Sequence, residues 1–387
     1  MTDEPATAAS PGRERLLSLD VFRGATMASM LLVNNPGDWD NLYSQLDHAA
    51  WNGWTFTDLI FPFFLWIVGV AIPLSMGRRL EKGEPRSAEV WRILRRSAIL
   101  IGIGLLLNGF PRYDFSTIRY PGVLQRIGVC YLFASLIFLN TGIRGQVLTI
   151  VGLLGGYWLL MAFMPVPGWG HGILSEHGNF SEFVDTLVLS GHTWRETKTY
   201  DPEGVISTLP AIATVLFGIM AGRLLKSRPA AADKTAWLFV AGNFLLLLGL
   251  IMNHWLPINK KLWTSTYSVF MAGLAFNIFA ITYWLVDVKG YKTWAKPLAT
   301  YGMNAITVFV LTGLLGRLST VISVGQANGR PVLLKTWLFG HIKAVFEQVA
   351  GPLATPKNSS LVYALMYVAL MYGVAWVMYR RKWFVRF

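Results

Sequence analysis

Seven polar residues lie at or near the ends of long apolar runs, and their side chains are candidates for chemistry: Asn34, His48, Asn52, Asp58, Arg119, Gln125 and Arg126. Polar groups at or inside such runs are costly to keep in hydrocarbon, so they are functional candidates. An imidazole changes charge near neutral pH and can act as a general base. A histidine in a loop is more often structural, but His48 stands beside Trp51, Asn52 and Trp54. Both interpretations of His48 therefore stay open.

A second group of charged residues could bind phosphate. Arg23 lies in the first apolar run, and arginines are frequent between residues 78 and 96, among them Arg78, Arg79, Arg95 and Arg96. Guanidinium groups form paired hydrogen bonds with phosphate oxygens. The alternative is that these arginines only mark the cytoplasmic side of a membrane protein. His171, His177 and His192 lack the spacing of metal ligands, so no metal site is expected.

The elements that carry these residues are expected to be membrane-spanning helices. Of the 387 residues, 53% are hydrophobic and only 14% are charged, whereas soluble domains carry about 25% charged residues. This composition argues against an ordinary soluble enzyme, a disordered protein and, with the single Cys130, a disulfide scaffold. Apolar runs of spanning length lie near 17–35, 56–77, 93–110, 121–140, 146–164, 205–225, 236–254, 264–286, 296–317 and 360–379. The sequence therefore predicts an all-α integral membrane protein, a single bundle of about ten transmembrane helices.

The basic residues predict the orientation of this bundle. They are concentrated in the N-terminal tail, in the tail after residue 379, and in the connections 78–96, 223–234 and 287–296. Lys and Arg next to spans stay in the cytoplasm, so ten spans place all of these segments there, with both termini cytoplasmic. The net charge of +13 is assigned to this asymmetry and not to nucleic acid. The stretch 333–350 is interrupted by charges and is expected to be an external interfacial or re-entrant helix.

Two further expectations concern boundaries and depth. Residues 1–16 have no apolar core of a signal peptide and are expected to be a cytoplasmic tail, followed by one transmembrane domain over 17–387.

Arg126 stands about 8 Å inside the bundle, counted from Pro121 at ~1.5 Å per residue. It needs a carboxylate or carbonyl groups, and Asp58 is the nearest candidate in depth.

Several ordered motifs resemble one known family, that of the heparan-α-glucosaminide N-acetyltransferases, which are membrane acyltransferases. The motifs are LDVFRG (Leu19–Gly24), LLVNN (Leu31–Asn35), HAAWNGWTFTDLIFPFF (His48–Phe64), IRYPGVLQRIG (Ile118–Gly128), YDPEGVISTLPAI (Tyr200–Ile212) and PINKKLWTSTY (Pro257–Tyr267). The resemblance extends over about residues 17 to 385. The chain lacks the extra luminal domain of the lysosomal member, so it looks like the shorter bacterial members. That resemblance implies a place in a bacterial cytoplasmic (inner) membrane.

The resemblance also implies a reaction and its residues. The family transfers the acetyl group of cytoplasmic acetyl-CoA to the amine of a glucosamine-type sugar across the membrane, and it forms homodimers. The family's active histidine falls on His48, and its catalytic asparagine falls on Asn34. The arginines Arg23, Arg78, Arg79, Arg95 and Arg96 are then candidates for the phosphates of CoA. Asn52, Asp58, Arg119, Gln125 and Arg126 are candidates for substrate binding or a structural polar network.

Elementary chemistry agrees with this assignment and leaves two alternatives open. An amine that attacks a thioester must lose a proton, which an imidazole can take. The thioester oxygen gains negative charge, which an amide N–H such as that of Asn34 can stabilise. One alternative is an O-acetyltransferase of a cell-wall sugar. The other is a sugar or amino-sugar permease without covalent chemistry, which would need no site for CoA phosphates.

Overall fold

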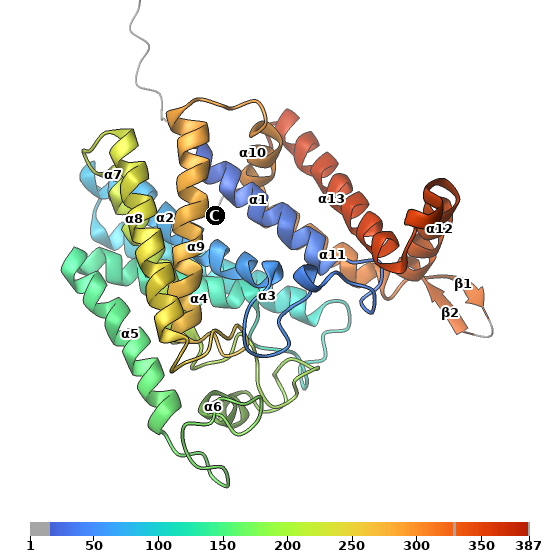
Figure 1. Cartoon of the computed structure of the whole chain (residues 1–387), viewed down its shortest axis with the longest axis horizontal. Coiled ribbons are helices and arrows are strands. Elements are labelled where there is room, and N and C mark those ends of the chain that lie inside the picture. Colours follow the sequence, from blue (N-terminus) through green and yellow to red (C-terminus); the bar gives the residue numbers. More distant parts are fainter. Residues whose placement is uncertain (1–15, 328–329, 386–387) are drawn as a thin grey trace, which may run out of the picture.

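A computed structural model describes residues 16–327 and 330–385, and most of them lie in helices (Figure 1). The helices are α1 (Leu17–Asn34), α2 (Ile60–Glu81), α3 (Arg86–Gly109), α4 (Val123–Asn140), α5 (Ile143–Phe163), α6 (Phe180–Leu189), α7 (Thr208–Lys226), α8 (Ala231–Met252), α9 (Ser265–Tyr283), α10 (Lys296–Met303), α11 (Ala305–Ser319), α12 (Leu334–Ala350) and α13 (Pro356–Arg380). Short helical turns are η1 (Ser44–Leu46), η2 (Phe56–Leu59), η3 (Trp284–Val288) and η4 (Gly351–Leu353). Strands β1 (Ser323–Ala327) and β2 (Arg330–Leu333) form an antiparallel hairpin. The expected tail is outside the described residues except for Leu16.

The described chain contains seven helices that are long and apolar enough to cross a membrane. They coincide with seven of the ten expected runs and confirm a helical membrane protein. The pair α10 and α11 would make an eighth span, but it is bent by 76°. The runs near 17–35 and 93–110 are helical as well, as α1 and α3. Asp20 and Arg23 make the first half of α1 polar, and arginines do the same in α3, so a count of ten spans is not confirmed.

Helix α12 covers the stretch that was expected outside the bundle. It has no buried residue and lies with the hairpin at the edge of the molecule (Figure 1). It is not among the candidate spans of the described residues. Whether it lies in the membrane interface stays a prediction.

The centre of the bundle is formed by α1, α2, α7 and α9. Helices α2 and α7 touch through glycines: a Cβ on Gly69 would lie 2.0 Å from the carbonyl oxygen of Val215. Small residues allow such close packing between helices in membranes. Next to this contact, the fully buried Trp66 packs against Phe22, Phe276 and Phe279. This rigid centre fixes the ends of α1 and α2, which carry the residues of chemical interest.

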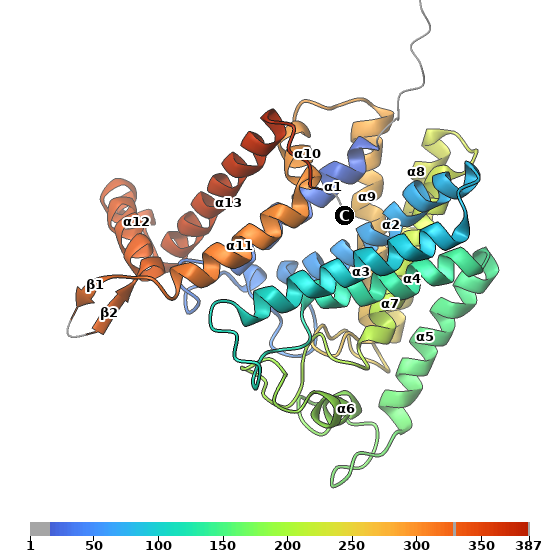
Figure 2. The same cartoon turned by 180° about the vertical axis from the view of Figure 1, so that it is seen from behind.

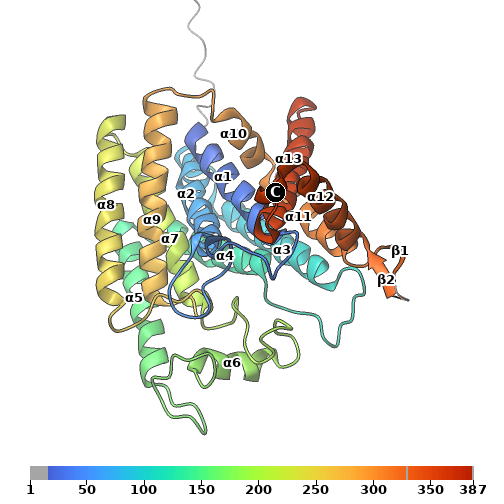
Figure 3. The same cartoon turned by 45° about the vertical axis from the view of Figure 1, so that its right-hand side comes forward.

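The long connections lie together at one end of the bundle, with α6 (Figure 3). The start of α1 and the connection from α9 to α10 lie at the opposite end. There the backbone N–H of Ser18 donates to Asp287, at 3.1 Å. An ion pair of 2.7 Å between Lys226 and Glu81 joins the ends of α7 and α2. This arrangement agrees with the expectation that the basic connections lie at one end of the bundle. Arg13, Arg15 and Arg386, in the two tails, lie outside the described residues.

Candidate active site

A histidine and a buried carboxylate form the centre of the site. The connection after α1 returns to η2, where Thr55 and Asp58 form a capping box at the N-terminus of the turn. His48 Nδ1 lies 2.7 Å from Asp58 Oδ1. The other carboxylate oxygen accepts hydrogen bonds from the backbone N–H groups of Ala49, at 3.1 Å, and Thr55, at 3.0 Å. Because an ionised carboxylate only accepts, it holds the ring proton on Nδ1 and leaves Nε2 as the basic nitrogen.

Asp58 is held in place from below and is 1% exposed. The hydroxyl of the buried Tyr267, near the start of α9, donates to the backbone carbonyl of Asp58 at 2.6 Å. His48 is the exposed member of the pair, with 44% of its side chain accessible. The exposed imidazole of His48 is thus held by the buried carboxylate of Asp58. In enzymes with a catalytic histidine, a carboxylate orients the imidazole in this way.

A lysine lies directly against the imidazole. Lys260 Nζ is 3.1 Å from Nε2 and 3.2 Å from Nδ1 of His48, and 3.9 Å from Asp58 Oδ1. Burial lowers the pKa of Lys260, although Asp58 and Glu203 act in the opposite direction. Sequence reasoning missed this residue. Its signal was a pair of lysines, Lys260 and Lys261, in a connection expected on the side where basic residues are disfavoured.

His48 and Asn34 line the same cavity, which has a volume of about 650 Å³. Asn34 is the last residue of α1, and among the described residues its exposed amide has no hydrogen-bond partner. Apolar residues near the ends of α1, α2 and α11 form another part of the lining, with Met30, Phe61, Phe64 and Phe309. The rim is charged and carries Arg119, Glu176, Glu203 and Lys261. The cavity thus brings an imidazole and an exposed amide together in a lining of charged and apolar residues.

An arginine–carboxylate cluster builds one wall of this cavity. Arg119 Nε donates to Asp201 at 2.7 Å, and its Nη2 donates to both Asp201 and Glu203. Burial alone would lower the pKa of Arg119, but Glu203 and Asp201 raise it, so the guanidinium stays charged. Asp201 is placed by its backbone N–H, which donates to Asp185 at 3.0 Å. Asp201 and Glu203, from the long loop before α7, were not among the predicted site residues.

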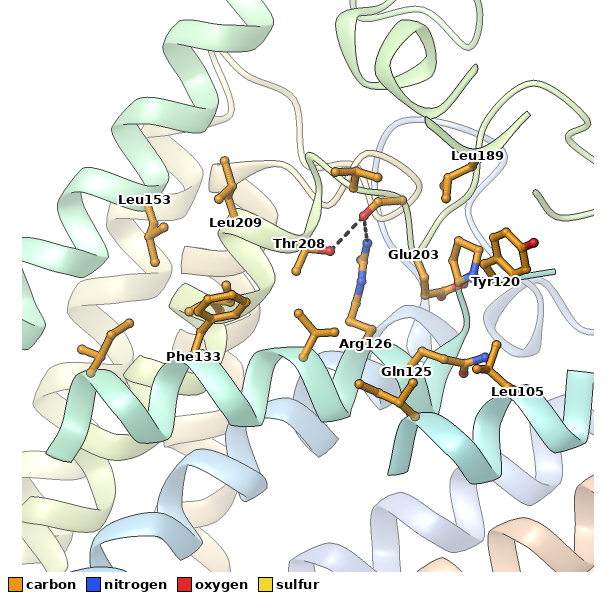
Figure 4. Close-up of a pocket in the computed structure, with 17 residues that line it drawn as sticks. Leu105, Tyr120, Gln125, Arg126, Phe133, Leu153, Leu189, Glu203, Thr208 and Leu209 are labelled. Carbon is orange, nitrogen blue, oxygen red and sulfur yellow. Dashed lines mark hydrogen bonds between the residues drawn. The ribbon is translucent and has the colours of Figure 1, made fainter. Parts of the chain in front are cut away.

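The expected pairing of Asp58 with Arg126 is wrong. Arg126 points from α4 toward the start of α7, and its Nη2 donates to the carbonyl of Gly204 at 2.9 Å (Figure 4). Nη2 also donates to Ser207 Oγ. Its Cζ lies 5.2 Å from the centre of the Trp263 ring. The two residues share a depth, but Asp58 faces His48 and Arg126 faces α7. Depth can be counted along a sequence, whereas the direction in which a helix turns its side chain depends on packing.

The other predicted polar residues divide between two places. Asn52 accepts a hydrogen bond from Asn259 at 3.2 Å, in the connection that carries Lys260. Gln125 and Arg126 line a second cavity, which the first cavity's lining shares only through Glu203. Asn34, His48, Asp58 and Arg119 line the first cavity together.

The five arginines proposed for phosphate binding face different elements. Arg79 binds the fully buried Glu89 of α3 through two hydrogen bonds, of 2.7 and 2.8 Å. Arg96 lies over the ring of Tyr131 in α4, at 4.8 Å. Arg23 contacts Asp20, at 3.1 Å, and the carbonyl of Gly302 in α10. Arg78 and Arg95 are exposed. Glu89 therefore occupies the Nε and Nη2 groups of Arg79, and Arg78 and Arg95 are the most exposed of the five.

No group of three or more metal-ligating side chains occurs in the described ranges.

Comparison with known proteins places this chain in a family. Residues 15–258 match a family model described as heparan-alpha-glucosaminide N-acetyltransferase, catalytic. The human protein named heparan-alpha-glucosaminide N-acetyltransferase is 31% identical over 351 residues, which cover 76% of this chain and 52% of the human one. The mouse protein of the same name is 32% identical, with 76% and 53% covered. The chain thus spans about half the length of the curated relatives it matches.

Proposed function

The chain belongs to the heparan-alpha-glucosaminide N-acetyltransferase family, and on this basis we propose that it transfers an acetyl group from acetyl-CoA to the amine of a glucosamine-type sugar. The observation that carries the proposal is the shared cavity, in which His48, supported by the buried Asp58, faces the same space as Asn34. These are the groups that acetyl transfer to an amine needs. The match over residues 15–258 contains all of them.

The reaction follows from the roles of these groups. The amine nitrogen attacks the thioester carbon, and His48 Nε2 takes the proton that the nitrogen loses. The carbonyl oxygen gains negative charge, which the Asn34 amide N–H stabilises. When the C–S bond breaks, CoA leaves as a thiolate and receives the proton from His48. Asp58 stabilises the protonated imidazole during this transfer.

Lys260 has to be accommodated in this scheme. Its amino group lies within hydrogen-bond distance of Nε2, where the acceptor's amine must approach. We infer that the acceptor displaces Lys260 from the ring, toward Asp58 and the acidic rim. There its charge would be compensated by Asp58 and Glu203, which already favour its protonated form.

The two substrates are proposed to enter from opposite sides of the membrane. Apolar residues of α1, α2 and α11 line the cavity, and the exposed Arg78 and Arg95 belong to the basic connection at the other end. About 30 Å of hydrocarbon separates the two faces, and the phosphates of CoA cannot cross it. The donor would lie within the bundle, with its phosphates near the basic connection and its thioester near Asn34. Both termini would be cytoplasmic in a bacterial inner membrane, and the homodimer stays a prediction from the resemblance.

The test is product analysis with isotopically labelled acetyl-CoA and a panel of amino sugars and hydroxyl-only sugars. The purified protein should form labelled N-acetyl sugar, identified by mass spectrometry. Label only on hydroxyl groups would favour the O-acetyltransferase. Sugar uptake into vesicles without any acetylated product would contradict the proposal and favour a permease.

In oriented proteoliposomes, acetyl-CoA on the face of Arg78 and sugar on the opposite face should yield acetylated sugar on the sugar side. Product only when both share one face would refute the transmembrane arrangement.

A further inference from the structure

A second cavity, of about 690 Å³, lies on the outer side of α4. Helices α3 and α4 run side by side, and α5 stands apart from α4 at the edge of the bundle (Figure 2). The cavity lies between them, with α7 behind it (Figure 4). Its walls are mainly aliphatic and aromatic, with Leu105, Val129, Phe133, Leu153 and Leu209. Such a groove is suited to hydrocarbon and not to a sugar.

The groove has the length and exposure of a lipid site. Phe133 is 49% exposed, on a helix that is apolar enough to cross a membrane. The lining residues of α4 run from Gln125 to Ile137, about 18 Å at ~1.5 Å per residue. One leaflet of a bilayer contributes about 15 Å, which is half of a ~30 Å hydrocarbon core. One acyl chain would therefore fill the groove from its polar end to the middle of the membrane.

The polar end of the groove holds an incompletely paired cation. Arg126 is 3% exposed and lines the cavity. Its Nη2 is hydrogen-bonded, but Nε and Nη1 have no partner within the described structure. None of the ion pairs found among residues 16–327 and 330–385 includes Arg126. Glu203 lines the same cavity but binds Arg119. A buried guanidinium without a bonded carboxylate is costly, so an anion at this position would be stabilising.

We propose that this groove binds an anionic phospholipid of the surrounding bilayer, with one acyl chain along α4 and its phosphate on Arg126. The apolar walls account for the chain, and the two unpaired donors of Arg126 account for the phosphate. A neutral lipid would fill the same walls, but its zwitterionic head would compensate the charge less. The groove shares only Glu203 with the acetyl-transfer cavity.

The test compares two photoreactive lipids in nanodiscs, phosphatidylglycerol and phosphatidylcholine with the same diazirine-bearing acyl chain. Crosslinked peptides are mapped by mass spectrometry. We expect labelling in the peptides that contain Phe133 and Leu153, with about a tenfold preference for phosphatidylglycerol. The variant Arg126→Gln should reduce this preference about tenfold, which corresponds to ~1.4 kcal/mol. Arg144→Gln, at the exposed start of α5, is the matched control and should leave the preference unchanged.

A second variant keeps the test valid if Arg126→Gln does not fold. Val129→Phe narrows the groove while Arg126 is retained, and it should lower the labelling of α4 and α5 by both lipids. Val151→Phe places the same side chain on an exposed site of α5 and should have no effect. Equal labelling of the wild type by both lipids would overturn the proposal. So would labelling that Val129→Phe does not change, or crosslinks from the groove to a second copy of the chain.

Discussion

Replacement of Asp58 by asparagine is the sharpest test of how the histidine is oriented. Both backbone donors, Ala49 and Thr55, bind Oδ2, whereas His48 binds Oδ1. The amide oxygen of an asparagine would keep the two backbone bonds. Its NH₂ group would then face His48, so Nδ1 must accept a hydrogen bond and the ring proton moves to Nε2. The loop keeps its geometry, but the nitrogen that faces the cavity is no longer basic.

The expected loss is that of a general base. Such a loss lowers kcat about 10²–10⁴-fold, or about 2.7–5.4 kcal/mol at ~1.36 kcal/mol per factor of ten. KM for acetyl-CoA should change little, because Asp58 is buried beside His48 and contacts none of the arginines proposed for the CoA phosphates. The assay is steady-state acetylation of glucosamine, with the thermal midpoint as a check on folding.

The control for this variant is Asp40→Asn, an exposed aspartate of the same connection, which should keep full activity. The double variant His48→Ala with Asp58→Asn should be no slower than His48→Ala, since the two residues act as one unit. A folded Asp58→Asn protein with kcat within about threefold of wild type, far inside the range for a lost general base, would refute the assigned orientation.

Three further predictions concern the neighbouring residues. Asn34→Ala should lower kcat about 10²–10³-fold with unchanged donor affinity, and Asn34→Asp should be slower still; a change in donor KM alone would make Asn34 a binding residue. Burial lowers the pKa of Lys260 below its ordinary value of 10.5. Between the lowered pKa and 10.5 the unfolded chain binds more protons than the folded protein, so the free energy of unfolding rises with pH in this window. The thermal midpoint of the wild type should therefore gain more on alkalinisation within this window than that of Lys260→Met; parallel curves would show that Lys260 is not desolvated. Asp58→Asn and Arg126→Gln should have additive effects on stability, because the two side chains have separate partners; strong coupling would restore the pairing that depth alone suggested.

The helices were largely predictable because hydrocarbon demands long apolar runs. Seven expected runs became helices of spanning character. The three exceptions have local causes: Asp20 and Arg23 in α1, the arginines in the first half of α3, and the sharp bend of 76° between α10 and α11. Composition shows where a chain is apolar, but a bend at a single residue hardly changes the composition of an apolar run.

The sequence predicted at which end of the bundle the site lies, but not which partner each side chain faces. Asn34, His48, Asp58 and Arg119 all lie at or near helix ends on the same side of the bundle, and they line one cavity. Their partners could not be counted from the sequence. Asp58 turns to His48, Arg119 turns to a loop some eighty residues later, at Asp201, and Arg126 turns away to α7. Lys260 was missed because its role depends on a loop that folds back over the histidine.

The central claim, that His48 is the base for acetyl transfer in this cavity, is tested most directly by one comparison. Acetylation of glucosamine is measured for the wild type, His48→Ala and the exposed-loop control His171→Ala, with acetyl-CoA binding followed in parallel by the shift in thermal midpoint. We expect His48→Ala to lose about 10²–10⁴-fold in turnover while acetyl-CoA still stabilises it, and His171→Ala to match the wild type. A His48→Ala protein that acetylates glucosamine at nearly the wild-type rate would contradict the account.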